Sequence, residues 1–196
     1  MKFTLSILAL LAIAFLVGCS AKDTRDNKLS NSEITKLGKK YGGVYVFNKK
    51  FEKEIDDRER ERKEAIKELK GRDLGGGLYA VDTKPVDQKL PQTLSNGKKY
   101  YTSTRSYEQD YKKAVNVSKK YINEVINFIG QEDYNKFKPS IDIGYFYVDN
   151  DEIVPIELSA TYSYQGTKFG LFGDEGRGFA LSRDEIRYTK GGNRFY

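Results

Sequence analysis

The 196-residue sequence has no histidine, no tryptophan and a single cysteine. Without histidine, the chain lacks the usual general base near neutral pH and the commonest metal ligand. Nucleophile pairs of the Ser-His and Cys-His kinds are therefore excluded. Carboxylates, Tyr, Lys and Ser remain as possible catalytic groups, and we expect neither a metal ion nor any other cofactor.

The chain has one long apolar run, and it lies at the N-terminus. This run covers residues 4–17, follows the positively charged start Met1-Lys2 and ends at the small residue Gly18. It is shorter than the roughly 20 apolar residues that a membrane-spanning helix needs. A polar stretch follows it directly, so the run has the layout of a cleaved secretory signal.

The junction Leu16-Val17-Gly18-Cys19 resembles the lipobox of bacterial lipoproteins, in which an aliphatic, a variable and a small residue precede an invariant cysteine. The resemblance covers residues 1–20 only. It implies that the Cys19 thiol receives a diacylglyceryl group, that the chain is cut between Gly18 and Cys19, and that the new amine is acylated. Several acyl chains hold a protein stably on a membrane, whereas one chain binds only marginally. Ser20 also resembles the outer-membrane sorting position of Gram-negative lipoproteins.

An ordinary secretory cleavage site beside Cys19 is the alternative, but it leaves a free thiol in an oxidising compartment. Lipidation removes that anomaly and withdraws the thiol from zinc binding and catalysis. We therefore expect a signal peptide (residues 1–18), an acylated N-terminus with a flexible tether (19–40) and one folded domain (41–196).

The charge balance is basic, with a formal net charge of +6 that falls by one when Lys2 is removed with the signal peptide. In an exported protein, this surplus favours anionic lipid, lipopolysaccharide or cell-wall polymer over nucleic acid as a partner. Ordinary solvation by surface lysines is the simpler explanation of the surplus. The expected partners are the membrane, through the lipid anchor, and an envelope protein or polymer.

The N-terminal half of the domain predicts a strand followed by a charged helix. Residues 41–47 (YGGVYVF) are rich in β-branched and aromatic side chains, which is typical of a strand. Asn48 suits the N-cap of a helix over residues 49–70, and Gly71 suits its end. The similar run at residues 75–82 predicts another strand, beside the first in one sheet or joined to it by a crossover.

A second helix is predicted over residues 106–129, ending at Gly130. Its apolar residues recur at helical spacing, and Ser106 with Gln109 resembles a capping box. We expect this helix to be the core helix, lying across a sheet. Residues 83–98 are expected to form a loop.

After Pro139 the apolar residues alternate with polar ones, which is typical of strands with one solvated face. A hairpin that turns on Asn150-Asp151 sets Ile143 opposite Leu158 and Tyr147 opposite Val154. These apolar residues then share one face, which defines the register.

Three more short strands are expected at residues 168–172, 178–182 and 185–189. The predicted fold class is α+β: an antiparallel sheet of meanders and hairpins in the C-terminal half, with about two helices packed on one face.

Two clusters are candidate functional sites. Tyr100, Tyr101, Arg105 and Tyr107 combine aromatic rings with a cation, a set that suits binding of a protein or glycan. Core packing is the simpler explanation for any one of these tyrosines.

The second cluster is Asp142 with Glu157, which the register places diagonally on the outer face of the hairpin. A carboxylate pair could cleave the glycosidic bonds of cell-wall sugars, although a solvated sheet face has the same composition. We therefore predict no catalytic residue: the chain is expected to be an envelope lipoprotein with a noncatalytic binding domain. A carboxylate-dependent cell-wall hydrolase is the alternative.

Overall fold

A computed structural model describes residues 29–174, 176, 178–189 and 191–196 of the chain. It confirms the α+β class, with most strands in the C-terminal half. The helices are α2 (Asn31–Tyr41), α3 (Lys49–Lys67), α4 (Lys84–Lys89), α5 (Thr104–Tyr111), α6 (Lys119–Ile129) and α7 (Gln131–Lys136). The strands are β1 (Gly43–Val46), β2 (Arg72–Gly75), β3 (Leu78–Ala80), β4 (Tyr100–Tyr101), β5 (Ser140–Ile143), β6 (Phe146–Asp149), β7 (Glu152–Pro155), β8 (Glu157–Thr161), β9 (Ser163–Asp174), β10 (Gly178–Tyr188) and β11 (Asn193–Phe195).

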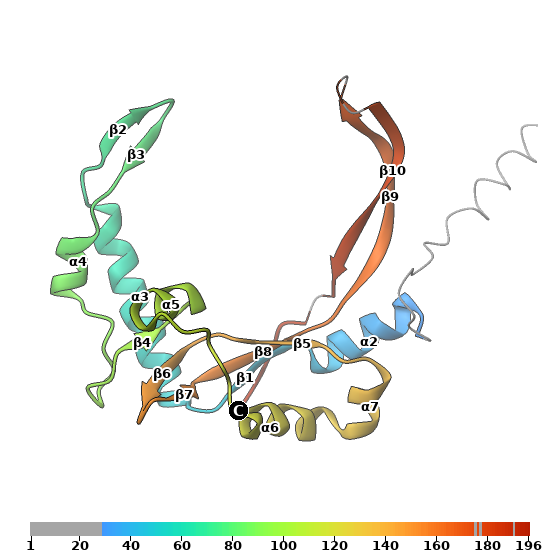
Figure 1. The fold of residues 1–196 in the computed structure, drawn as a ribbon, viewed down its shortest axis with the longest axis horizontal. Coiled ribbons are helices and arrows are strands. Elements are labelled where there is room, and N and C mark those ends of the chain that lie inside the picture. The colour runs from blue at the N-terminus through green and yellow to red at the C-terminus, as the bar shows by residue number, and fades with distance from the viewer. Residues whose placement is uncertain (1–28, 175, 177, 190) are drawn as a thin grey trace, which may run out of the picture.

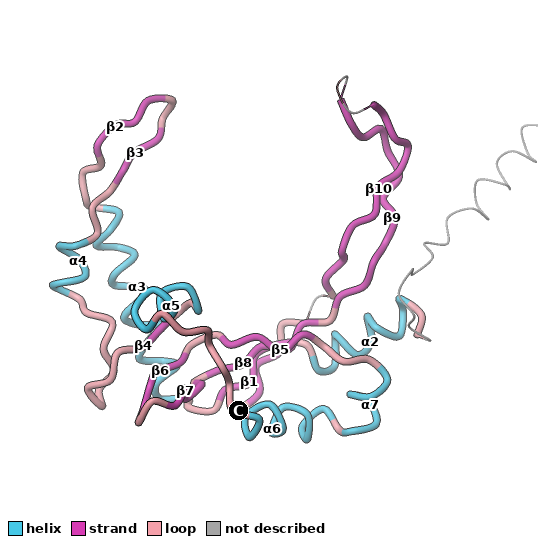
Figure 2. Tube along the Cα trace, in the orientation of Figure 1, coloured by secondary structure: helices cyan, strands magenta, loops and turns pink. Residues whose placement is uncertain are grey.

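The molecule consists of a body and two projecting hairpins. Helices and short strands form the body, and the hairpins β2–β3 and β9–β10 rise from its two ends toward the same side (Figure 1). Figure 2 shows that the β9–β10 hairpin is the longer of the two. We call these hairpins the short arm (residues 72–80) and the long arm (residues 163–188).

Two sheets in the body share one bent hairpin. The four-stranded sheet has the order β11-β1-β8-β5, and the three-stranded sheet has the order β4-β6-β7. In this hairpin, β5 pairs with β8 and β6 pairs with β7. The regular pairing is interrupted between these two halves, where the Ile156 and Glu157 amides both donate to the Tyr145 carbonyl, at 2.7 and 3.1 Å. This interruption divides the hairpin between the two sheets.

The register predicted from the sequence is confirmed on both sides of the interruption. Ile143 lies opposite Leu158, and Tyr147 lies opposite Val154. The turn residues Asn150 and Asp151 have φ angles of 49° and 61°, as a two-residue type I′ turn requires.

Burial on the hairpin differs from the expectation of one solvated face. On one face, Ile156 packs with α3, and Leu158 packs with α2, β1 and α6. In the β6–β7 half the other face is buried as well, because Phe146 and Ile153 pack against Tyr107 of α5. The helices therefore cover both faces of that half rather than one.

The expected tether over residues 19–40 is wrong for its second half, because α2 begins at Asn31 and is part of the folded body. Ser30 caps α2, and the Ser30 and Glu33 side chains and backbones bond reciprocally as a capping box. Ile34 is fully buried in the core that contains Leu158. Polar composition concealed this helix, whose single apolar stripe is covered by the sheet.

The two helix predictions had different outcomes. Asn48 caps α3 as predicted, by accepting a hydrogen bond from the Phe51 amide. The single core helix over residues 106–129 is wrong, since a break with Lys112 at φ 55° separates α5 from α6. Ser103 rather than Ser106 is the N-cap of α5. The break lets α5 and α6 cover different parts of the hairpin.

Several strand predictions were also wrong in detail. Strand β3 pairs with β2 in the short arm and does not lie beside β1. The expected loop over residues 83–98 contains α4. The three short strands expected after residue 167 are instead parts of two long strands, β9 and β10, that pair over most of their length.

The last strand is held to the body by an ion pair. Strand β11 lies parallel to β1, and the Arg194 guanidinium donates to the buried Glu52 carboxylate of α3 at 2.6 Å. Arg194 also lies 3.4 Å from Glu157. Because Glu52 is only 4% exposed, its charge depends on this partner for compensation.

We expect Arg194→Met to lower the free energy of unfolding by about 2 kcal/mol, because it leaves the Glu52 charge without its counterion. Chemical denaturation of the chain from Ser20 to Tyr196 measures this loss. Arg187→Met removes a more exposed pair with Glu185 and is the matched control, expected to change stability by less than about 0.5 kcal/mol. Equal losses in the two variants would contradict the role assigned to Arg194.

Candidate interaction surface

Both arms expose large apolar side chains. Their exposed fractions run from 37% for Val81 to 78% for Leu181. The short arm and the residue after it expose Leu74, Leu78, Tyr79 and Val81, and the long arm exposes Phe169, Leu171, Phe179, Leu181, Ile186 and Tyr188. Single exposed apolar residues are common on proteins, but contiguous groups of them mark interaction sites.

The lower part of the long arm has two chemically different faces. Cross-strand partners share a face of the sheet, and so do residues an even number of positions apart on one strand. Phe169 of β9 pairs with Ser182 of β10, and Ile186 follows Ser182 by four residues. Phe169 and Ile186 therefore lie on one face. The opposite face carries Lys168 directly opposite Arg183, an unfavourable pairing of like charges.

Between Lys168 and Asp174, the long arm has a segment with no charged residue in either strand. Residues 169–173 (FGLFG) and 178–182 (GFALS) run side by side here. A register shift between Ala180 and Ser182 interrupts their pairing. Arg183 directly follows this segment on the body side, and its guanidinium lies over the Phe172 ring of the segment, 4.7 Å from the ring centroid. The segment thus offers an apolar strip bounded on the body side by cations.

No third strand covers the outer edges of the long arm in the part of the chain that the structure describes. Among the described residues, β9 and β10 form a two-stranded sheet and pair only with each other. Each strand therefore presents a row of backbone N–H and C=O groups to its surroundings. Such edges are templates for another strand.

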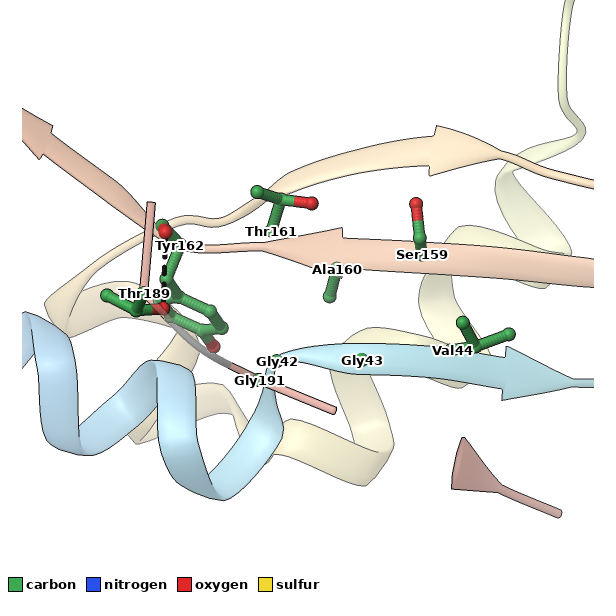
Figure 3. Close-up of a pocket in the computed structure, with 9 residues that line it drawn as sticks. All are labelled: Gly42, Gly43, Val44, Ser159, Ala160, Thr161, Tyr162, Thr189 and Gly191. Carbon is green, nitrogen blue, oxygen red and sulfur yellow. Dashed lines mark hydrogen bonds between the residues drawn. The ribbon is translucent and has the colours of Figure 1, made fainter. Parts of the chain in front are cut away.

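The base of the long arm is tightly fixed to the body (Figure 3). The Thr189 amide and hydroxyl both donate to the Tyr162 carbonyl, at 2.9 and 3.2 Å, and so close the two ends of the arm. A Cβ added to Gly38 would lie 1.9 Å from the Thr189 hydroxyl oxygen, so α2 packs directly against this closure. The adjacent pocket of about 140 Å³ is smaller than the roughly 300 Å³ of ordinary ligand sites.

The aromatic surface predicted from the sequence is wrong, because three of its four residues lie in the core. Tyr100, Tyr101 and Tyr107 are 1%, 3% and 5% exposed, and only Arg105 faces solvent. The hydroxyls still find partners, since Tyr100 donates to Glu59 at 2.6 Å and Tyr101 donates to Asp110 at 3.0 Å. The functional candidates Gly18 and Cys19 lie outside the described residues.

The candidate carboxylates Asp142 and Glu157 have the predicted diagonal placement. Asp142 lies opposite Ser159, and Glu157 precedes Ser159 by two residues on β8. Burial raises the pKa of Glu157 above its usual value, and the nearby Arg194 charge opposes that rise. Asp142 accepts a hydrogen bond from the Ser140 hydroxyl at 2.9 Å. Glu157 is fitted closely into the body, because a side chain at Gly144 would collide with its carboxylate.

The sequence of the long arm shows its apolar strands but not their exposure. The apolar residues of 169–172 and 178–181 predict short strands of a meander, but apolar content alone does not say whether a strand is buried. Exposed apolar strands and buried ones have the same local composition. Only the placement of the arm beyond the body distinguishes them.

Comparison with protein family models, curated protein sequences and solved structures finds no match to this chain. Within residues 29–196, as far as they are described, no helix combines the length and apolarity needed to cross a bilayer. The same part of the chain holds no group of three or more His, Cys, Asp or Glu side chains placed to bind a metal ion.

We expect Glu157→Gln to raise the free energy of unfolding at pH 7. When the pKa of a carboxyl is higher in the folded chain than in the unfolded chain, folding disfavours its charged form. Such a carboxyl lowers the free energy of unfolding progressively as the pH rises above about 4.5. The gain should therefore disappear at lower pH. Urea denaturation at pH 4 and 7 tests this, with the exposed Glu152→Gln as control. A loss of stability at pH 7 would show that the Arg194 contact outweighs burial.

Proposed function

We propose that this chain is a membrane-anchored bacterial envelope lipoprotein, and that its folded domain is a noncatalytic module that binds a protein partner through the long arm. The observation that carries the proposal is the exposed apolar surface of that arm, from Phe169 to Tyr188, on two strands that no third strand covers among the described residues. The lipobox resemblance at Cys19 supports the anchored location.

The backbone of the arm favours a protein over the interior of a bilayer as its partner. In hydrocarbon, any backbone N–H or C=O group at a strand edge that the protein itself does not satisfy would remain without a hydrogen bond, at a cost of several kcal/mol each. An added strand satisfies these groups, and its alternate side chains can pack on the apolar strip. We infer that the partner supplies an extended segment with apolar side chains.

The anchor and the arm are compatible in position. Residues 20–30 separate Cys19 from α2 and span at most roughly 40 Å when extended. Helix α2 packs beside the base of the long arm (Figure 1). The arm therefore works within reach of the membrane that holds the acyl chains, where envelope proteins are concentrated.

The test of the arm uses cells that carry a photo-crosslinkable amino acid at Leu181, in the apolar strip. We expect a specific envelope protein to be captured repeatedly, and capture to be lost in the double variant F169S/F179S. The variant should keep its melting temperature, because both side chains are more than 60% exposed. The matched control is L74S/L78S in the short arm, which removes comparable apolar area at the other end of the molecule.

Two results would overturn this assignment. Capture that persists in F169S/F179S would show that the apolar strip does not bind the partner. Capture of a second copy of the chain alone, with a dimer by analytical ultracentrifugation, would replace an envelope partner with self-association.

The anchored location has its own test. We expect the protein to incorporate radioactive palmitate in cells, and Cys19→Ser to abolish the label and impair normal processing, because acyl transfer requires the thiol. Serine is nearly isosteric with cysteine, so the rest of the signal segment is kept intact. An unlabelled wild-type protein, or a variant that is processed and membrane-bound as before, would contradict the proposal.

A carboxylate-dependent hydrolase remains the second candidate, and the raised pKa of Glu157 is the observation that favours it, since general acids of glycosidases have this property. Clearing of cell wall in an activity gel by the chain from Ser20 to Tyr196, abolished in Glu157→Gln, would support the hydrolase over a noncatalytic module.

A further inference from the structure

A polar pocket lies in the body between α3, α4 and α5, away from the long arm. Its volume is about 440 Å³, within the roughly 300–1,000 Å³ of ordinary ligand sites. The side chains that matter for recognition are Arg62, Asp87, Gln92, Lys99, Gln109 and Asp110. The pocket is thus lined by charged groups and amides rather than by apolar side chains.

The charges of the pocket are paired. Arg62 donates to Asp87 at 2.5 Å, and Lys99 donates to Asp110 at 2.5 Å. These bonds hold the pKa of both carboxyls below the usual value. Two cations and two carboxylates balance, so the pocket gives no net attraction to an ion of either sign. A neutral ligand with its own donors and acceptors fits this balance.

Arg62 is held rigidly in the pocket floor. Its side chain is 9% exposed, and it also donates to the Leu90 carbonyl. The neighbouring Glu59 carboxylate accepts hydrogen bonds from Tyr100 at 2.6 Å and from Gln92 at 2.8 Å. It lies 3.6 Å from the Arg62 Nε, beyond hydrogen-bond distance. This Nε is one of the buried polar atoms left without a hydrogen-bond partner in the described structure.

Adjacent hydroxyls of a sugar match this arrangement. One hydroxyl can donate to a carboxylate while its neighbour accepts from the adjoining cation, and such charge-assisted bonds are the stronger kind. Each of the pairs Arg62–Asp87 and Lys99–Asp110 offers an acceptor beside a donor. Gln109 on α5 adds an amide that can both donate and accept.

We propose that this pocket binds a neutral sugar unit, either an N-acetylated amino sugar or a neutral hexose. The pocket and the long arm do not share residues, so this inference stands apart from the binding of a protein partner. A sugar bound here and a strand bound at the arm can be held at the same time.

The test uses the chain from Ser20 to Tyr196, which retains every element of the described fold. Titration with N,N′,N″,N‴-tetraacetylchitotetraose and with maltotetraose is followed by NMR chemical shifts. We expect at least one probe to shift the resonances of pocket residues. Gln109→Ala and Lys99→Met should weaken that binding about fivefold or more.

Gln131→Ala is the matched control, because Gln131 is an exposed glutamine of α7 outside the pocket. It should bind as the wild type does. The two probes separate the possible sources: preference for the acetylated sugar indicates cell-wall glycan, and preference for maltotetraose indicates a neutral polysaccharide. Absence of binding by both probes, shifts confined to other regions, or unchanged affinity in both pocket variants would overturn the proposal.

Discussion

The antiparallel hairpin over residues 140–161 is the element on which the rest of the structure depends. Its two-residue turn at Asn150-Asp151 fixes the register, and one interruption opposite Ile156 divides it between two sheets. Helices α2, α3 and α6 pack on one face, and α5 packs on the other face of the turn half. A shift of one residue in this register would move every buried side chain to the wrong face.

The long arm is a continuation of this hairpin, because β9 follows β8 after a single residue. The chain returns through Thr189, which bonds back to Tyr162, and ends in β11 beside β1. Both ends of the arm are therefore fixed in the body sheet. A rigidly held strand pair loses little conformational freedom on binding, which favours its use as a recognition element.

The body and the long arm differ in how their charged and apolar side chains are compensated. In the body, buried charges such as Glu52 and Arg62 are compensated by ion pairs and hydrogen bonds. In the arm, Lys168 lies opposite Arg183 and large apolar groups face solvent. These are local costs that an isolated fold does not require. The long arm carries the larger number of these exposed apolar groups, and this is the physical argument behind the partner proposed for it.

Local patterns were sufficient where neighbouring residues decide the structure. The Asn48 cap, the hairpin turn and the cross-strand register were all predicted correctly, because capping and turn geometry depend on a few adjacent residues. The break near Lys112 was missed since Tyr107 and Val125 share a helical period although they belong to different cores. The tyrosines at 100, 101 and 107, a candidate binding surface in the sequence, lie in the core, in agreement with the simpler explanation of core packing.

The sequence by itself determined the α+β class, the hairpin and its register, and the N-terminal segment that resembles a lipoprotein signal. Only the tertiary structure decided which apolar strands are buried and which project, and which charged side chains meet in one pocket. The physical reason is that period and propensity report on a residue's own segment. Burial of Tyr100, exposure of Leu181 and the meeting of Arg62 with Asp87 depend on segments far apart in the chain.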